Sequence, residues 1–140
     1  MPASLPARAY ALPLALFLAL PLAACSDAVQ TQYRDLDEAR AAGALQRGWL
    51  PAWLPARAGA IIEAHDLDTN RRAARFALPD GARIEPPGCA PADGRLPPPA
   101  LALPGWPASL HQDGAAGRHR LFRCGDGYAA FDAGHGYLWN

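Results

Sequence analysis

Three oxygen-bearing side chains alternate along a short segment near the middle of the chain and could bind a cation. Asp66, Asp68 and Asn70 match the first, third and fifth positions of a calcium-binding loop of the EF-hand type. The match then fails, because Arg71 stands where that loop needs glycine and Ala77 stands where it needs glutamate. Aspartate and asparagine are also typical of turns, where their side chains accept hydrogen bonds from nearby backbone amides. We therefore predict a functional turn at these three residues and no bound metal.

Catalytic chemistry has little support in this sequence. One hypothesis is a metal-dependent enzyme that uses the neighbouring side chains of His65, Asp66 and Asp68. No His-x-x-x-His spacing of a zinc site occurs, and no Gly-x-Ser-x-Gly motif of a serine hydrolase. We expect the histidines on the surface or in turns; they are His65, His111, His119 and His135. The sequence predicts no catalytic residues and no cofactor.

The first 24 residues have the features of a secretory signal peptide. Arg8 supplies a positive charge, the segment from Tyr10 to Leu22 is apolar, and the small residues Ala23 and Ala24 precede the first cysteine. The apolar run has roughly 13 residues, whereas a membrane-spanning helix needs about 20. We therefore predict that residues 1–24 are cleaved.

The sequence Leu22-Ala23-Ala24-Cys25 resembles the lipobox of bacterial lipoproteins. The resemblance implies that Cys25 carries a diacylglyceryl group and palmitate and becomes the first residue of a lipid-anchored protein. An ordinary signal peptide with a chance cysteine and a membrane anchor that is never cleaved are the alternatives. Ser26 follows Cys25, which in the enterobacterial sorting scheme implies the outer membrane, facing the periplasm.

The two remaining cysteines, Cys89 and Cys124, form an even pair. In an exported protein they meet an oxidising environment, in which thiols form disulfides. The loop between them has about 36 residues, and closing it stabilises the fold by about 4 kcal/mol in the chain-entropy description. A redox-active pair and two metal ligands are the alternatives. Because no Cys-x-x-Cys spacing supports either of them, we predict a structural disulfide.

Length and charge limit the class of protein and its partners. Removing residues 1–24 from the 140 leaves enough chain for a single small domain. The formal charge of the full chain is zero, so there is no basic excess that would favour nucleic acid. We expect a lipidated tether over residues 25–34 and one domain over residues 35–140.

Two short helices are predicted in the first half of this domain. Asp35 and Glu38 form a capping box, which predicts a helix over Leu36–Ala42 that is ended by Gly43 or Gly48. Apolar residues then recur at helical spacing after a proline, which predicts a second helix over Pro55–His65.

Between the two predicted helices the chain repeats the unit Trp-Leu-Pro, at residues 49–51 and 53–55. Each proline restricts its own backbone and that of the residue before it, so this segment is stiff. Tryptophans can form a surface for a ligand, but in a domain with few large side chains we expect them in the core. They are Trp49, Trp53, Trp106 and Trp139.

The second half of the domain predicts a small sheet and a long connector. The predicted strands are Arg72–Leu78, Arg120–Cys124, Tyr128–Asp132 and Tyr137–Asn140. Eight prolines between Pro86 and Pro107 exclude regular structure and predict an extended connector. The predicted fold class is α+β, with two short helices packed on a small antiparallel sheet of about four strands.

One part of the chain resembles a known family. The residues that carry the resemblance are Gly48-Trp49-Leu50-Pro51, Leu54-Pro55, Ile61-Ile62 and Asp66-Leu67-Asp68-Thr69-Asn70. This pattern is similar to the YbbD head-domain group, a family of small bacterial lipoproteins without an established activity. The resemblance covers residues 35–78 and implies an envelope protein in which the turn at 66–70 matters. It transfers no catalytic residue.

These observations favour a lipid-anchored periplasmic envelope protein that acts as a binding or structural module. Its expected partners are the membrane, through the lipid, and another envelope protein. One alternative is an inhibitor or immunity protein against an envelope-lytic enzyme, which rests on analogy. The metal-dependent enzyme with His65, Asp66 and Asp68 is the other.

Overall fold

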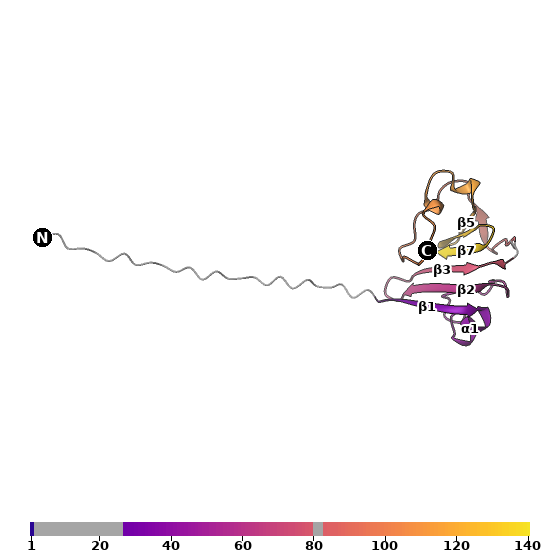
Figure 1. The fold of residues 1–140 in the computed structure, drawn as a ribbon, viewed down its shortest axis with the longest axis horizontal. Helices are drawn as coiled ribbons and strands as arrows, with labels where there is room; N and C mark the ends of the chain where they lie inside the picture. The colour runs from indigo at the N-terminus through magenta and orange to yellow at the C-terminus, as the bar shows by residue number, and fades with distance from the viewer. Residues whose placement is uncertain (2–26, 80–82) are drawn as a thin grey trace.

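The computed structural model describes Met1, residues 27–79 and residues 83–140. These residues form a seven-stranded antiparallel sheet with the strand order β1-β2-β3-β7-β6-β5-β4 (Figure 1). The strands are β1 (Ala28–Asp35), β2 (Gly59–Asp66), β3 (Arg71–Ala77), β4 (Cys89–Pro91), β5 (Arg120–Cys124), β6 (Gly127–Phe131) and β7 (His135–Trp139). Helix α1 (Leu36–Ala41) follows β1, and the 3-10 helices η2 (Ala108–His111) and η3 (Ala115–Gly117) precede β5.

The predicted fold class, with two helices on a sheet of four strands, is wrong. Within residues 27–79 and 83–140, α1 is the only α-helix, and it has six residues. The sheet gains β1, β2 and β4, which the sequence had assigned to a tether, a helix and a connector. In the same residues no helix is long and apolar enough to span a membrane. The domain is therefore mostly β-structure.

Strand β2 replaces most of the second predicted helix, Pro55–His65. Ile61, Glu63 and His65 share one face of the strand and alternate with Ile62 and Ala64 on the other. The helical spacing of the apolar residues was misleading, because the charge of Glu63 hides the two-residue alternation. Glu63 is fully buried, so the inward face of this strand includes an acid among apolar residues.

Strand β1 begins at Ala28, where a polar tether through residue 34 was expected. It pairs with β2 from Ala28 opposite Asp66 to Asp35 opposite Gly59. Its alternating Val29, Thr31 and Tyr33 are residue types that favour strands. The chain therefore enters the sheet three residues after the predicted lipidation site. Cys25, Ser26 and the predicted signal peptide up to residue 24 lie outside the described residues, apart from Met1.

Helix α1 lies where the capping box predicts it. Asp35 Oδ1 accepts a hydrogen bond from the backbone amide of Glu38 at 2.8 Å, and Glu38 Oε2 accepts one from the amide of Arg34 at 2.6 Å. Gly43 follows with a φ of +82°, the left-handed conformation that commonly ends helices. This prediction is confirmed, with a helix one residue shorter than expected.

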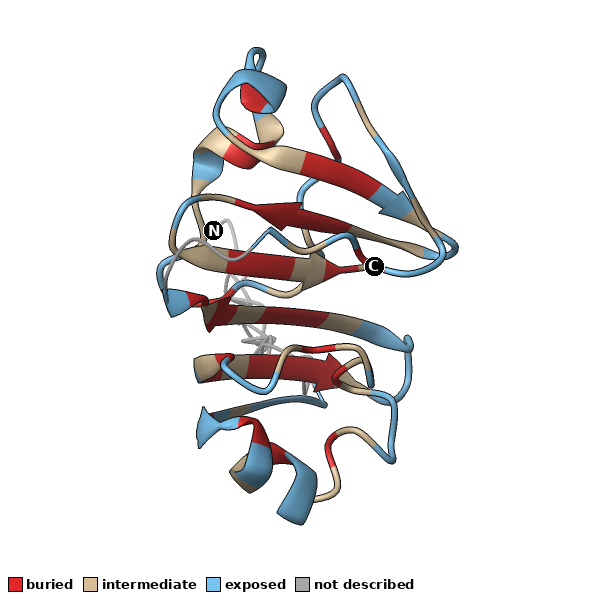
Figure 2. Cartoon of the chain, turned by 90° about the vertical axis from the view of Figure 1, so that its right-hand side faces the viewer, coloured by how far each residue is buried: buried red, intermediate tan, exposed pale blue. Residues whose placement is uncertain are grey.

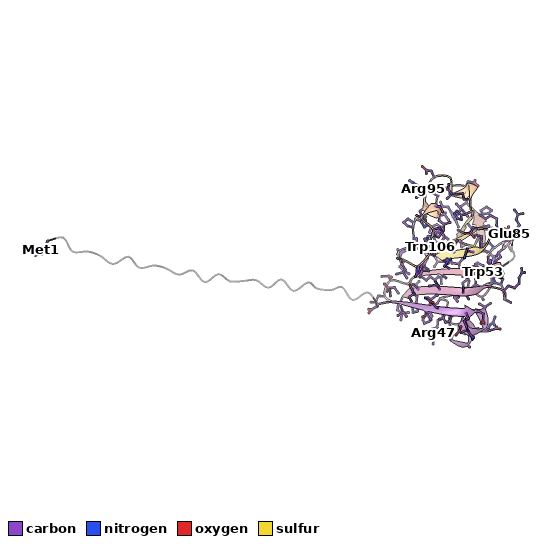
Figure 3. All side chains as sticks on the ribbon, viewed as in Figure 1. Met1, Arg47, Trp53, Glu85, Arg95 and Trp106 are labelled. Carbon is purple, nitrogen blue, oxygen red and sulfur yellow. A yellow bond between two sulfur atoms is a disulfide. The ribbon has the colours of Figure 1, made fainter. Side chains whose placement is uncertain are left out.

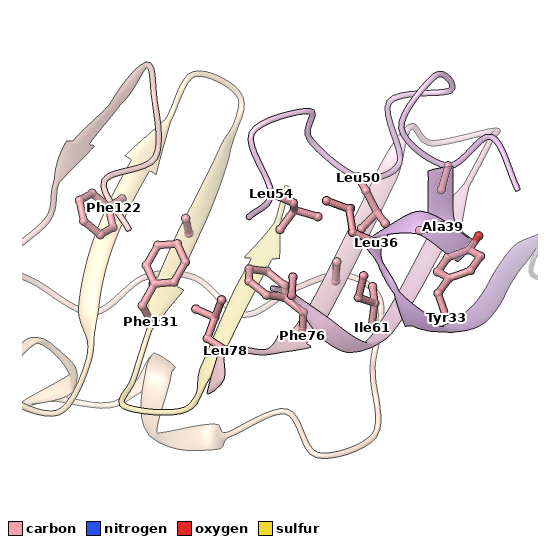
Figure 4. Close-up of a cluster of buried hydrophobic side chains, with 14 residues drawn as sticks. Tyr33, Leu36, Ala39, Leu50, Leu54, Ile61, Phe76, Leu78, Phe122 and Phe131 are labelled. Atoms are coloured by element: carbon pink, nitrogen blue, oxygen red, sulfur yellow. The ribbon is translucent and has the colours of Figure 1, made fainter. Parts of the chain in front are cut away.

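Both faces of the sheet are covered, so the domain has two hydrophobic cores (Figure 2). Helix α1 and residues 43–58 cover one face, here called the helix face. Residues 92–119 cover the other, the connector face. Trp53 packs against the helix-face core and Trp106 against the connector-face core (both are labelled in Figure 3). Figure 4 shows the helix-face core, whose largest members are Tyr33, Leu50, Ile61, Phe76, Phe122 and Phe131.

The C-terminal half follows the sequence prediction more closely. Strands β5, β6 and β7 form two consecutive hairpins, and β5 has the predicted bounds. The proline-rich segment is irregular apart from the three-residue β4, and it buries Leu96 and Leu103 on the connector face. Cys89 lies directly opposite Cys124 in the β4–β5 pair, and the predicted disulfide between them is present.

Candidate functional site

An apolar cleft of about 240 Å³ lies at the end of the sheet where β1 begins. The strand register brings its walls together, because Ala73 and Tyr128 both pair with Trp139. Ala28 marks the same end of the sheet, because it pairs with Asp66, which pairs with Arg71 beside the cleft residue Arg72. Its principal lining residues are Trp49, Trp53, Arg72, Cys124, Asp126 and Leu138. The cleft therefore combines residues from the two ends of the domain sequence.

The repeated Trp-Leu-Pro segment supplies one wall of the cleft. Leu50 and Leu54 are buried in the helix-face core, whereas Trp49 and Trp53 are only partly buried. Each proline carbonyl accepts a turn hydrogen bond, from Leu54 at 3.2 Å and from Ala58 at 2.9 Å. The leucines thus fix the segment on the sheet, while the tryptophans reach the cleft.

Two aromatic rings in the lining of the cleft, Trp49 and Tyr128, already have their faces occupied by other side chains. Trp49 stacks on His65 with ring centroids 3.6 Å apart, and the Arg47 guanidinium lies 4.8 Å from the Trp49 ring centroid. The Tyr128 ring centroid lies 5.5 Å from the ring centroid of Trp139 and 5.7 Å from the guanidinium carbon of Arg123. Because these rings present edges rather than free faces, they are poorly suited to stacking against a flat ligand. The expectation of core tryptophans is confirmed for Trp139, which is buried.

Arg72 and Asp126 form a loose charged pair in the lining of the cleft. Arg72 Nη2 lies 3.7 Å from Asp126 Oδ1, and both side chains are substantially exposed. Arg72 Nη1 also donates to the carbonyl of Gly48 at 2.7 Å, which ties the tryptophan segment to β3. A separation of 3.7 Å is longer than a direct hydrogen bond, so both groups keep capacity for another partner.

The sequence did not single out Arg72, Asp126 or Glu63. Arg72 and Asp126 are 54 positions apart and meet only because β3, β7 and β6 are neighbours in the sheet. The turn Gly125-Asp126-Gly127 directly after Cys124 was the one signal that could have placed Asp126 beside the disulfide. Nothing in the sequence distinguishes Glu63 from an exposed acid.

A buried polar pair, Glu63 and His65, lies against Trp49 through the stacked His65 ring. Glu63 Oε1 lies 2.8 Å from His65 Nδ1, and both residues are buried. The second carboxyl oxygen, Glu63 Oε2, is buried without a hydrogen-bond partner among the described residues. Burial raises the pKa of Glu63, although the hydrogen bond and the charge of His65 oppose the increase. Burial and the nearby Glu63 in turn raise the pKa of Tyr33.

Replacing Glu63 with glutamine should change how stability depends on pH. The pKa of Glu63 is higher in the folded chain than in the unfolded chain. As pH rises above the ordinary value of 4.5, the unfolded chain therefore releases this proton while the folded chain still holds it. The contribution of Glu63 to the free energy of unfolding falls with rising pH. The urea midpoint of Glu63→Gln should therefore improve relative to the wild type as pH rises above about 4.5.

Glu85→Gln is the matched control for this prediction, because Glu85 is 76% exposed and pairs loosely with Arg120 at 3.3 Å. It should leave the pH profile of the midpoint unchanged. A Glu63→Gln profile parallel to that of the wild type would contradict the prediction.

The acidic turn predicted at residues 66–70 is present between β2 and β3. Asp66 Oδ1 accepts hydrogen bonds from the amides of Asp68 at 2.9 Å and Thr69 at 3.2 Å, and Asn70 has a φ of +55°. A hydrogen bond to Asp27, together with the charge of that residue, raises the pKa of Asp68. Asp66 thus has the local role expected of a turn residue, and a function for the turn stays a prediction.

The four histidines lie deeper than the sequence suggested. His65 is buried, so its expected surface position is wrong, and the other three are half-buried. Trp106 Nε1 donates to His111 Nε2 at 2.9 Å, which leaves His111 Nδ1 to donate to the Leu96 carbonyl at 3.0 Å. His135 Nε2 lies 3.1 Å from a guanidinium nitrogen of Arg75. These contacts fasten the connector and the β6–β7 turn.

A serine and a histidine meet on the connector face without forming a catalytic relay. Ser109 Oγ lies 3.1 Å from His119 Nε2, and burial lowers the pKa of His119. His119 Nδ1 is buried and has no hydrogen-bond partner in the described ranges. The carboxylate of Asp132 accepts instead from two backbone amides of the following turn and from the Tyr137 hydroxyl. The arrangement braces the connector.

The geometry gives no support to the metal-dependent enzyme. His65 is turned toward Glu63 and Trp49, whereas the Asp66 carboxylate is engaged in its own turn. Residues 27–79 and 83–140 contain no group of three or more histidine, cysteine, aspartate or glutamate side chains placed to hold a metal ion.

The fold and the cleft define a small antiparallel β-sheet domain with an apolar cleft of about 240 Å³ at one end. Residues 27–77 match the family model described as the YbbD head domain. The match spans β1 to β3, and so includes Trp49, Trp53, Glu63 and the acidic turn but neither cysteine of the disulfide. Comparisons with curated proteins and with solved structures found no match. The family resemblance is supported for this part of the domain, and it brings no activity with it.

Proposed function

We propose that this protein is a lipid-anchored binding module of the bacterial envelope and that the cleft is its binding site. The observation that carries the proposal is an apolar cleft of about 240 Å³ whose lining includes the loosely paired charges of Arg72 and Asp126. An apolar depression with a few polar groups is the usual form of a binding site. The match to the YbbD head domain and the lipobox-like sequence before Cys25 support the envelope location.

Lipidation of Cys25 would bring the cleft close to a membrane. Strand β1 begins at Ala28, and three residues of extended chain span at most about 10 Å. The cleft lies at the same end of the sheet as Ala28. The bound component would therefore be an envelope protein near the membrane surface. Ser26 after Cys25 favours the periplasmic face of the outer membrane.

Blocking the mouth of the cleft tests the binding role. Asp126 is 70% exposed in the β5–β6 turn, so Asp126→Trp should obstruct the cleft with little effect on the core. After crosslinking in cells, pull-down of the full-length chain should recover a partner with the wild type and lose it with Asp126→Trp. Asp113→Trp is the control, because Asp113 is 96% exposed and pairs with Arg95, which lies well away from Trp53 (Figure 3). Equal recovery with all three proteins would contradict the proposal.

Replacing Cys25 with alanine tests the anchor. Without the thiol no thioether to a diacylglyceryl group can form, so the variant should show no incorporation of radiolabelled palmitate and should accumulate as the unprocessed precursor. The Cys89→Ala/Cys124→Ala variant keeps Cys25 and should still be labelled and processed. Labelling that persists in Cys25→Ala would contradict lipidation at this residue.

A further inference from the structure

The described lining of the cleft carries one charge of each sign, on Arg72 and Asp126. Arg72 Nη2 lies 3.7 Å from Asp126 Oδ1, and Arg72 Nη1 donates to the Gly48 carbonyl at 2.7 Å, which holds the arginine side chain in place. Arg72 keeps other N–H groups that no described residue fully uses, and a guanidinium fork suits a carboxylate. The Asp126 carboxylate can accept a hydrogen bond from an N–H group beside it. The cleft therefore suits a ligand that has a carboxylate close to an N–H donor.

The volume and the walls limit the rest of the ligand. At about 240 Å³ the cleft is smaller than the roughly 300–1,000 Å³ of sites for drug-sized molecules. Its walls include Trp53, Leu138 and the Cys89–Cys124 disulfide, which are apolar. A single large apolar side chain matches this space, and the faces of Trp49 and Tyr128 are not free to stack on a sugar ring.

We propose that the cleft binds the C-terminal residue of a partner polypeptide, with an apolar side chain in the cleft and the terminal carboxylate on Arg72. In a C-terminal residue the carboxylate and the backbone N–H are attached to the same carbon atom. Arg72 Nη2 and Asp126 Oδ1 are 3.7 Å apart, so Arg72 can hold the carboxylate while Asp126 accepts the N–H of the same residue. This inference rests on the proposed binding role of the cleft and specifies the group that is recognised.

The test compares ligands and leaves the protein unchanged. The full-length chain in detergent is titrated calorimetrically with the peptide N-acetyl-Ala-Gly-Ala-Phe, with its C-terminal amide, and with the same peptide ending in glycine. The free acid should bind at least about tenfold more tightly than the amide, which lacks the charge-assisted bond to Arg72. It should also bind about tenfold more tightly than the glycine peptide, which leaves the apolar cleft unfilled.

A pair of matched variants locates the carboxylate. Arg72→Lys keeps the positive charge but loses the forked guanidinium group. It should weaken binding of the free-acid peptide about tenfold and leave the weak binding of the amide peptide unchanged. Arg95→Lys, in the similar exposed pair with Asp113, should change neither. A folding defect in Arg72→Lys would reduce the affinity for both peptides alike. The ratio of the acid affinity to the amide affinity therefore reports the specific contact.

Three outcomes would overturn the inference: no binding of the free acid at about 1 mM, equal affinity for acid and amide, or tighter binding of free phenylalanine than of the peptide. The last would assign the cleft to a small zwitterion. If the partner captured in cells still depends on an open cleft, the proposed function survives and only the C-terminal recognition fails. If Asp126→Trp recovers the partner as the wild type does, the binding role itself fails.

Discussion

Removing the disulfide should lower the free energy of unfolding by about 4 kcal/mol, the larger part of the stability of a small domain. Cys89 and Cys124 are 35 positions apart, and their bond closes the segment that contains the whole connector. Without it, β4 and the connector must be ordered by buried leucines such as Leu96 and Leu103 and by hydrogen bonds such as that from Trp139 Nε1 to the Pro97 carbonyl. The Cys89→Ala/Cys124→Ala variant should therefore show a much lower urea midpoint than the oxidised wild type.

A reductant supplies the control for this experiment. Dithiothreitol should lower the urea midpoint of the wild type nearly to that of the double variant, and it should leave the midpoint of the double variant unchanged. A wild-type midpoint that does not respond to reduction, or free thiols at both positions in exported protein, would contradict a structural disulfide.

Adding a single methyl group at Gly136 should destabilise the domain by about 3 kcal/mol, through overpacking at the centre of the sheet. Gly136 in β7 lies opposite Phe76 in β3 and Phe131 in β6. A Cβ atom on Gly136 would lie 2.2 Å from Phe76 Cζ, and Phe76 is fully buried. The ring can move only by displacing Phe131, which it meets edge to face at 6.5 Å. Thermal unfolding of Gly136→Ala should show a clearly lower midpoint.

Gly134→Ala is the matched control, two residues away in the turn before β7. A Cβ there would meet no atom within 4 Å, so its effect should stay within about 0.5 kcal/mol. Replacing the Phe76 ring with the smaller side chain of leucine in the Gly136→Ala background should restore part of the lost stability. Similar midpoints for Gly134→Ala and Gly136→Ala would show that the packing at Phe76 is looser than the structure has it.

The sequence predicted the elements whose signals are local. The capping box of Asp35 and Glu38 and the acidic turn at residues 66–70 depend on nearby residues, and the structure has them where they were expected. The prediction of a helix in place of β2 failed because Glu63 is buried, with its carboxylate against His65, and this burial comes from the tertiary fold. The alternation of Val29, Thr31 and Tyr33 would have identified β1, but its polar neighbours suggested a tether.

The candidate site was harder to predict than the elements around it. Trp49 and Trp53 stood out as a repeat, yet their position at a cleft depends on the pairing of β3 with β7 and of β7 with β6. Arg72 and Asp126 carry no local signal, because an arginine in a strand and an aspartate in a turn are ordinary. The fold creates the pair by placing distant strands side by side.

Site-specific photo-crosslinking in cells tests the central claim most directly. A photoreactive phenylalanine analogue at position 53 would lie in the wall of the cleft, and the same analogue at position 95 would lie in a separate, exposed part of the domain (Figure 3). The account predicts a discrete protein adduct from position 53 and none from position 95. An adduct from position 95 alone, or no adduct from position 53 in cells that contain the processed and acylated protein, would contradict it.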